Sequence, residues 1–217
     1  MTFDVDYALH ILPMLLRATV ITFQATAWGM AFAIVGGLIL ALMRMSRFRP
    51  VSMLAGAYIQ FVRSTPLLTQ LFFLFYILPK YGLMLDAFMT GVLGLGLHYS
   101  SYTAEVYRGG IQGVPRGQWE AATALNMTPF RTWRLVVLPQ AIPPVIPALG
   151  NYLVGMFKDT PLLATITVLE LLGVALAEAG QTFRYLEPIT LVGLIFLALS
   201  IPSAIFVRVL ERRFATR

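Results

Sequence analysis

The chain consists of long apolar runs separated by short segments that hold most of its charged residues. From Ala18 to Met43 there is no charge, and this run exceeds the roughly 20 residues that a helix needs to cross a bilayer. The same reading predicts five spans in all, at 18–43, 55–78, 83–104, 146–168 and 188–207. We therefore expect an all-α integral membrane fold, with one domain over residues 1–217 and the two termini on opposite sides of the membrane.

Prolines set the start of the fourth expected span. The uncharged stretch from Leu135 to Phe157 is long enough to cross a membrane, but prolines recur in its first half. Proline removes a backbone donor and collides with the preceding turn, so a run of prolines interrupts a straight helix. We therefore expect the fourth span to begin only near Ile146, after Pro139, Pro143, Pro144 and Pro147.

Composition supports a membrane protein. Charged residues make up 12% of the chain and hydrophobic residues 58%, with a mean hydropathy of +0.77. Soluble domains carry about 25% charged residues, so this chain cannot cover a water-facing surface. In a soluble protein the net charge of +6 would suggest nucleic acid as a partner. Here we expect the bilayer to be the surroundings and no nucleic-acid partner.

Basic residues gather in the segments on one side of the expected spans. Short cytoplasmic loops are enriched in Lys and Arg, which fixes the orientation of a multi-pass protein. We therefore expect a cytoplasmic C-terminus and an external N-terminus in a bacterial cytoplasmic membrane. The cytoplasmic set is Arg44, Arg47, Arg49, Arg108, Arg116, Arg131, Arg134, Arg208, Arg212, Arg213 and Arg217, against Arg17, Lys80 and Arg184 on the other side.

Residue types that support catalysis or metal binding are scarce. There is no cysteine, and the two histidines, His10 and His98, lie in different segments. A metal site or a Ser-His-Asp arrangement within the chain is therefore not expected. No phosphate-binding loop occurs, and the two lysines are Lys80 and Lys158. We expect no catalytic residue, no metal ligand and no cofactor bound by this chain.

Most of the hydrophilic sequence falls in one cytoplasmic loop, residues 105–140. Pro115 precedes strong helix formers, Asn126 favours the left-handed conformation that ends helices, and Thr128-Pro129 can start a second helix. The loop is thus predicted to form helix, turn and helix. Either it docks into a partner through apolar residues, or it lies on anionic lipid. The residues concerned are Trp119, Phe130 and Trp133 for docking, and Arg116, Arg131 and Arg134 for lipid.

The same loop resembles the EAA loop of ABC importer permeases, whose pattern is E-A-A-x3-G-x9-I-x-L-P. The matching positions are Glu120, Ala121, Ala122, Asn126, Val136, Leu138 and Pro139. Asn126 stands where the family has Gly, and Val136 where it has Ile. The resemblance implies a five-helix, type I importer permease with a MetI-like fold. It also implies that Glu120, Ala121, Ala122, Asn126, Leu138 and Pro139, together with Trp119, couple the chain to an ATPase.

Other segments narrow the resemblance. Phe61-Val-Arg-Ser-Thr-Pro-Leu-Leu-Thr-Gln and Ala104-Glu-Val-Tyr-Arg-Gly-Gly-Ile resemble the polar amino-acid uptake branch of these permeases. Ala124-Leu125-Asn126, Phe157-Lys-Asp-Thr-Pro-Leu-Leu and Arg184-Tyr-Leu-Glu-Pro resemble ectoine and hydroxyectoine permeases. The implied partners are a dimer of cytoplasmic ATP-binding subunits holding ATP and magnesium, a second permease subunit of the same or a paralogous kind, and an extracytoplasmic solute-binding protein.

Ionisable residues at membrane depth are costly and usually face a cavity or a partner. Arg63-Ser-Thr-Pro-Leu-Leu and Lys158-Asp-Thr-Pro-Leu-Leu each place a charge before a Thr-Pro pair that interrupts a helix, which is tolerated where the helix lines a cavity. Alternatively, Lys158 and Asp159 neutralise each other or charges of other subunits, and Arg63 extends to the cytoplasmic interface. The residues expected to line the solute pathway are Arg63, Thr65, Glu105, Lys158, Asp159 and Thr160.

These observations predict the permease subunit of an ATP-driven importer for a small polar or zwitterionic solute, such as an amino acid or ectoine. Two other classes compete. A secondary transporter driven by an ion gradient usually has two inverted halves, which five spans and one large loop do not supply. A membrane scaffold without transport activity would account for the cytoplasmic loop but not for the charges at membrane depth.

Overall fold

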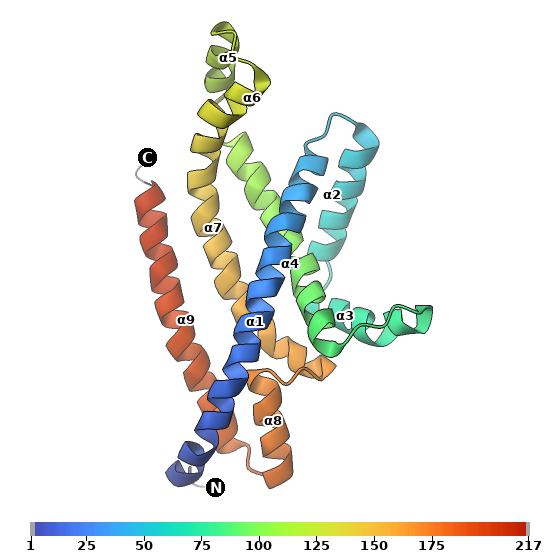
Figure 1. Ribbon diagram of the computed structural model, residues 1–217, viewed down its shortest axis with the longest axis vertical. Helices are drawn as coiled ribbons and strands as arrows, with labels where there is room; N and C mark the ends of the chain where they lie inside the picture. Colours follow the sequence, from blue (N-terminus) through green and yellow to red (C-terminus); the bar gives the residue numbers. More distant parts are fainter. Residues whose placement is uncertain (1–2, 216–217) are drawn as a thin grey trace.

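A computed structural model describes residues 3–215, and all regular structure in this range is helical (Figure 1). Arg217, counted above among the basic residues, lies outside the described residues. Four long helices lie along the length of the molecule: α1 (Val5–Arg44), α4 (Ala87–Gln112), α7 (Leu138–Asp159) and α9 (Leu186–Ala215). Shorter helices connect them, namely α2 (Arg49–Arg63), α3 (Leu67–Phe72), α5 (Arg116–Ala124), α6 (Pro129–Thr132) and α8 (Leu171–Thr182).

Within residues 3–215, α1 and α9 are the two single helices that are long and apolar enough to cross a membrane. They contain the expected spans 18–43 and 188–207. Two bent helix pairs also qualify if each is counted as one span, Arg49–Arg63 with Leu67–Tyr81 and Pro129–Ile166 with Leu171–Thr182. All but the first four residues of the expected span 83–104 lie in α4, whose polar residues include His98, Ser100 and Ser101. The number of spans therefore stays a prediction.

The expected span 55–78 is not one straight helix. It is divided between α2 and α3, and the chain turns through 105° between them. The interruption lies at Ser64-Thr65-Pro66, where proline lacks a backbone donor and its predecessor avoids the helical conformation. The predicted break at Thr65-Pro66 is thus confirmed. After α3 the chain continues as a π-helical turn and a short 3₁₀ helix to Tyr81, and in Figure 1 this segment projects sideways from the bundle.

The expectation that prolines interrupt the helix before residue 146 is wrong, whereas the start of the fourth span near Ile146 stays a prediction. α7 begins at Leu138 and contains Pro143, Pro144 and Pro147 in its interior. Pro139 is the second residue of α7, but it continues the helical run from η3, so its missing donor also falls within a helix. Interior prolines persist in membrane helices because neighbouring helices and local adjustments satisfy the freed carbonyls. Here a π-helical turn, η3 (Trp133–Val137), directly precedes the proline-rich start.

α4 lies at the centre of the bundle and packs closely against α1. Its Gly96 lies against Phe32, and Gly37 of α1 lies against Thr103, so a methyl group at either glycine would overlap its neighbour. The Thr103 hydroxyl donates a hydrogen bond of 2.7 Å to the carbonyl of Ala33. Small residues allow two backbones to approach closely, and buried hydroxyls hydrogen-bond across the contact. The tight α1–α4 pair thereby forms the frame on which the other helices pack.

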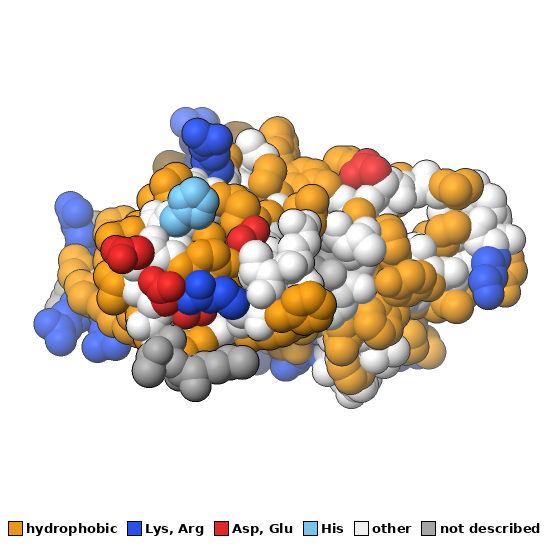
Figure 2. Space-filling model, turned by 90° about the horizontal axis from the view of Figure 1, so that it is seen from below, with side chains coloured by type: hydrophobic (Ala, Val, Ile, Leu, Met, Phe, Trp, Pro, Cys, Tyr) orange, Lys and Arg blue, Asp and Glu red, His pale blue; other side chains and the backbone are white. Residues whose placement is uncertain are grey.

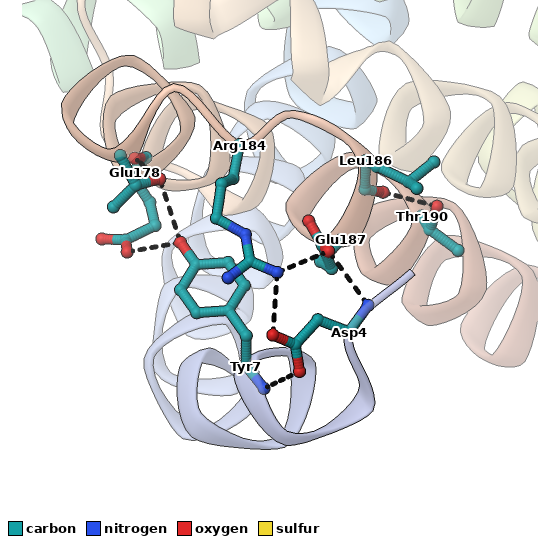
Figure 3. Close-up of polar contacts among 8 residues, drawn as sticks. Asp4, Tyr7, Glu178, Arg184, Leu186, Glu187 and Thr190 are labelled. Carbon is teal, nitrogen blue, oxygen red and sulfur yellow. Dashed lines mark hydrogen bonds and ion pairs between the residues drawn. The ribbon is translucent and has the colours of Figure 1, made fainter. Parts of the chain in front are cut away.

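At the N-terminal end of the bundle, a cluster of charged residues joins α1 to the α8–α9 connection (Figure 3). The Arg184 guanidinium donates to Asp4 at 3.0 Å and to Glu187 at 2.8 Å, and the backbone N–H of Asp4 donates to Glu187 at 3.1 Å. Arg184 also lies 4.1 Å from the centre of the Tyr7 ring. Figure 2, which views the molecule from this end, shows acidic and basic side chains gathered here beside a largely hydrophobic surface. We call Asp4, Tyr7, Arg184 and Glu187 the N-terminal polar cluster.

Candidate functional site

Residues 113–137 form a helical hairpin at the end of the molecule opposite the N-terminus (Figure 1). Its first arm is α5, which begins at Arg116 directly after Pro115. Proline without a donor is suited to a helix start, because the first backbone N–H groups of a helix have no partner within it. The predicted sequence of helix, turn and helix is confirmed.

The turn of the hairpin is made by Asn126. Its φ is 50°, in the left-handed region, and the N–H of Met127 donates to the carbonyl of Ala122 at 3.0 Å. This bond closes the end of α5 as in the usual left-handed helix cap. Thr128 then lies at the N-cap of α6 with Pro129 as the first helical residue, although the Thr128 side chain makes no capping hydrogen bond. Asparagine therefore fills the place that glycine holds in the EAA pattern.

Two tryptophans hold the arms of the hairpin together. The rings of Trp119 and Trp133 meet edge to face with centroids 5.5 Å apart. Both pack on a small buried cluster that includes Val114 and Val137. These tryptophans support the hairpin from within, whereas Leu125 and Phe130 are 75% and 71% exposed. Exposed apolar side chains of this size at a hairpin tip are typical of a docking surface.

The residues that match the EAA pattern occupy both exposed and buried positions. The Glu120 carboxylate accepts from Arg116 at 3.0 Å, one turn earlier, and both side chains are largely exposed. Ala122 is buried, while Ala121 and Asn126 are exposed. Leu138 and Pro139 lie exposed where α7 begins. An exposed ion pair such as Arg116–Glu120 contributes little stability, so Glu120 remains free to change partners.

The second arm of the hairpin has no break before α7. α6 passes into η3 and η3 into α7, with helical backbone angles at both junctions: φ −61° and ψ −50° at Trp133, φ −60° and ψ −41° at Leu138. A single helical run therefore joins the hairpin to the middle of the bundle. The run also contains a π-helical turn and several prolines, which are the features at which helices bend.

A charged cleft of about 600 Å³ opens between α1, α2 and α4. Within it, Arg108 donates to Glu105 through Nε at 3.0 Å, and the two side chains form an ion pair. Of the residues expected to line a solute pathway, Arg63 and Glu105 both face this cleft. The charged cleft is lined by Arg44, Met45, Met53, Gly56, Ile59, Gln60, Arg63, Glu105, Arg108 and Gln112.

Arg63 borders a group of aromatic side chains between α4 and α7. Its guanidinium lies 5.2 Å from the centre of the Tyr102 ring. Tyr102 in turn lies 5.6 Å from Tyr152 and 6.1 Å from Tyr99, measured between ring centres. We call Tyr99, Tyr102 and Tyr152 the tyrosine cluster. Arginine over an aromatic face is stabilised by a cation–π interaction, which favours this position of the Arg63 side chain.

Asp159 and Lys158 point in different directions. The Tyr99 hydroxyl donates to Asp159 at 2.7 Å, whereas Lys158 is exposed in a separate groove of about 450 Å³ beside α9. No ion pair joins the two among the residues that the structure describes.

Thr160 is buried and donates to the carbonyl of Phe157 at 2.7 Å. Thr65 accepts at 2.8 Å from Gln70, which also hydrogen-bonds His98. Arg63 and Glu105 are thus the two expected pathway residues that share one cleft, and mutual neutralisation of Lys158 and Asp159 does not occur.

The two Thr-Pro-Leu-Leu segments meet at α4. Leu71, which follows the first break, packs against Gly94, and Leu163, which follows the second, packs against Gly91. The Tyr76 hydroxyl donates to the carbonyl of Thr165 at 3.2 Å, which links the segments directly. Both interrupted helices therefore rest on the same glycine-bearing face. A shift of one segment must displace the other or the α4 contact, because packed interiors leave few voids.

Sequence reasoning missed the tyrosine cluster and Gln70. Tyr99 and Tyr102 follow His98 within one turn of α4, but Tyr152 comes from α7, and only the α4–α7 contact brings the three rings together. The signal that was available is the aromatic spacing in His98-Tyr-Ser-Ser-Tyr102. Among the described residues, no group of His, Cys, Asp and Glu is arranged to hold a metal ion. The expectation that this chain binds no cofactor stays a prediction.

Comparison with known proteins gives consistent matches over nearly the whole chain. Residues 33–216 match the family described as binding-protein-dependent transport system inner membrane component. A probable amino-acid ABC transporter permease of Sinorhizobium fredii is 50% identical over 96% of this chain and 90% of its own length. Another, PatM of Vibrio harveyi, is 40% identical over 90% of this chain and 89% of its own.

A solved structure also matches. The crystal structure described as an amino acid ABC transporter with histidines contains a chain that is 34% identical to this one. The match covers 98% of this chain and all of that one, with a TM-score of 0.92. The arrangement of broken helices and hairpin described above is therefore that of a known permease fold.

Proposed function

The chain belongs to the family of binding-protein-dependent transport system inner membrane components, and we propose that its charged cleft and tyrosine cluster form the solute pathway of an amino-acid importer. As a family member it is a membrane-embedded permease subunit of an ABC importer, and ATP hydrolysis belongs to a separate subunit. Its partners accordingly include an ATP-binding subunit and a solute-binding protein.

The observation that carries the proposal is the unbroken helical run from the hairpin to Asp159. In the proposed mechanism the hairpin docks on a dimer of ATP-binding subunits, which hold ATP and magnesium. Closure of that dimer on ATP moves the hairpin, and α7 carries Tyr152 and Asp159 relative to α4. Packed interfaces switch between discrete arrangements rather than deforming continuously, so this movement would open or close the pathway.

We assign the solute contacts to Arg63 and Asp159, with Glu105 lining the pathway as the partner of Arg108 and Thr65 held beside Gln70. Arg63 offers a guanidinium to a carboxylate, and Asp159 offers its remaining lone pairs to an ammonium group. Arg63 and Asp159 lie on opposite sides of the tyrosine cluster, so one α-amino acid meets them in succession rather than together. Thr160 is proposed to become accessible only when the second broken helix moves. Ectoine, also a small zwitterion, stays a predicted solute beside the amino acids.

Lys158 is proposed to face a second permease subunit, of the same or a paralogous kind. Its side chain is exposed beside α9, and a lysine at membrane depth needs water or a protein partner.

The asymmetry of basic residues supports a cytoplasmic hairpin and C-terminus, with the N-terminal polar cluster outside. The solute-binding protein would then dock near that cluster.

Transport in reconstituted vesicles tests the proposal. The permease would be co-purified with its ATP-binding subunits, inserted in proteoliposomes and supplied with the solute-binding protein. We expect uptake of a labelled amino acid that requires ATP and magnesium. A Walker-A lysine variant of the ATP-binding subunit is the control and should abolish uptake. Uptake driven by an ion gradient without ATP would instead establish a secondary transporter, and a complex that moves none of the twenty amino acids nor ectoine would favour a scaffold.

A further inference from the structure

The charged cleft contains more cationic than anionic side chains, and its one acid is already paired. Arg44, Arg63 and Arg108 line it together with a single carboxylate, Glu105. Glu105 accepts from Arg108 through two nitrogens of the guanidinium, and Arg108 also donates to Gln112 at 2.6 Å. The cleft therefore presents positive charge to whatever enters it.

Arg63 is the cation that the protein leaves available. Arg44 donates to Ser52 at 2.8 Å, and Arg108 is held by Glu105, but no carboxylate lies within ion-pair distance of Arg63 in residues 3–215. Its contact is with the ring face of Tyr102. A guanidinium stacked on an aromatic ring keeps its N–H groups directed outward, where they can bind a carboxylate through two hydrogen bonds.

The position of Arg63 distinguishes it from the basic residues that set membrane orientation. α2 begins at Arg49 and ends at Arg63, so at 1.5 Å per residue the two lie about 20 Å apart along the helix. A cation at the C-terminal end of a helix is also favoured by the helix dipole. The helix dipole therefore explains why a basic residue ends α2. It does not explain why Arg63 faces a polar cleft that has no free carboxylate.

We propose that the charged cleft selects solutes by charge, so that it accepts amino acids of zero or negative net charge and rejects basic amino acids. This proposal rests on the proposed function, because it assumes that the cleft belongs to the solute pathway. The α-carboxylate binds Arg63, and the α-ammonium group lies against the ring faces of the tyrosine cluster. A second cationic group meets Arg44 and Arg108, and the one carboxylate of the cleft, Glu105, is already paired with Arg108 through Oε2. The surroundings of that group therefore stay net positive, at a cost in binding.

Direct binding to the purified complex tests the proposal without the selectivity of the solute-binding protein. Permease and ATP-binding subunits are dialysed against radiolabelled glutamate, glutamine or arginine, and the bound fraction is counted. We expect glutamate and glutamine to bind at least tenfold more tightly than arginine. Arginine binding as tight as glutamine, or no binding of any of the three, would overturn the proposal.

Two substitutions sharpen the test. Arg63→Gln removes the guanidinium and should weaken glutamate binding by about tenfold or more, because hydrogen bonds to charged groups are the strong ones. Gln60→Glu, which adds a carboxylate to the wall of the cleft one turn before Arg63, should raise arginine binding at the expense of glutamate. The matched controls are Arg47→Gln in the α1–α2 connection and Gln181→Glu at the end of α8, both exposed and outside the cleft.

The outcomes separate this proposal from the proposed function. Each variant is first checked for an intact complex by gel filtration and for ATP hydrolysis. If Arg63→Gln and Gln60→Glu leave the order of affinities unchanged in an intact complex, the charge selection is wrong even when ATP-driven uptake is normal. If ATP-driven uptake fails for every amino acid in the wild-type vesicles, the proposed function itself is wrong.

Discussion

At the scale of single residues, the turn of the hairpin depends on a backbone conformation that few residues tolerate. Asn126 has a φ of 50°, which glycine and asparagine adopt far more readily than other residues. This preference is local, so the sequence alone predicted the turn correctly. The consequence is that position 126 accepts glycine but not a β-branched residue.

We expect Asn126→Val to weaken docking of the ATP-binding subunit, and Asn126→Gly to preserve it. A side chain in the left-handed region costs about 1–2 kcal/mol, and more when it is β-branched. The measurement is the amount of ATP-binding subunit that co-purifies with a tagged permease. Thr123→Val, on the exposed face of α5, is the matched control and should co-purify normally. Equal recovery with valine and glycine at position 126 would contradict the role of the turn.

At the scale of helices, the two interrupted segments rest on α4 through positions that have no side chain. A methyl group on Gly94 would lie 2.5 Å from a δ-carbon of Leu71, and because Leu71 is fully buried, its displacement must shift other packed atoms. Overfilling a packed site costs about 1–3 kcal/mol. The position of α3 against α4 therefore depends on Gly94 as much as on Leu71.

We expect Gly94→Ala to lower the midpoint of thermal unfolding of the purified permease. The control is Gly180→Ala, because nothing lies within 4 Å of a methyl group at that position in α8. Combined with Leu71→Ala, the effect of Gly94→Ala should largely vanish, since the colliding carbons are gone and contacting residues are not additive. If Gly94→Ala lowers the unfolding midpoint by the full amount in the Leu71→Ala background as well, the collision with Leu71 is not the cause of the lowering.

The continuity of the hairpin with α7 gives a prediction about coupling. We expect two glycines inserted between Val137 and Leu138 to abolish ATP-driven uptake while the ATP-binding subunit still co-purifies. Glycine destabilises a helix interior, so the insertion interrupts the run that transmits the movement. Uptake in vesicles and co-purification are the two measurements.

The same two glycines inserted after Gly113, in the non-helical link before α5, serve as the control and should leave most of the uptake. Glu120→Leu should lower co-purification of the ATP-binding subunit and uptake together, because it removes a proposed docking residue and leaves the helical run intact. Normal uptake with the insertion at 137–138 would exclude α7 as the transmitting element.

The sequence predicted what depends on neighbouring residues and failed where distant contacts decide. The Thr65-Pro66 break and the Asn126 turn follow from local backbone preferences, and both are confirmed. The helical part of α7 before residue 146 was missed, because the surrounding helices tolerate prolines that would interrupt an isolated helix. The tyrosine cluster escaped notice because Tyr152 reaches Tyr99 and Tyr102 only through the α4–α7 packing.

At the scale of the whole molecule, the hairpin and the N-terminal polar cluster occupy opposite ends of the bundle (Figure 1). The N–H of Tyr7 and the guanidinium of Arg184 hold the pKa of Asp4 below its ordinary value of 3.8. A carboxyl group with a lowered folded-state pKa contributes stability that is present above the ordinary value. That contribution to stability is lost as the pH falls through the lowered folded-state pKa.

We therefore expect the N-terminal end to loosen when the pH falls below about 4. Amide hydrogen exchange of the first two turns of α1 should accelerate in that range, and Asp4→Asn should accelerate it already at neutral pH. Asp6→Asn, on the exposed side of the same turn, is the control. If amide exchange at neutral pH is identical in Asp4→Asn and in the wild type, the N-terminal polar cluster is not what protects the start of α1.

The N-terminal polar cluster also constrains the order in which the molecule is made. The hydrogen bond from Asp4 to Glu187 joins positions 183 residues apart, so α1 enters the membrane long before its partner is synthesised. Until then Asp4 has neither Arg184 nor Glu187 beside it, and the start of α1 is held by its own cap alone. Closing the cluster is among the last steps of assembly. A chain that stops short of α9 therefore leaves this end open and is distinguishable by proteases from a finished subunit.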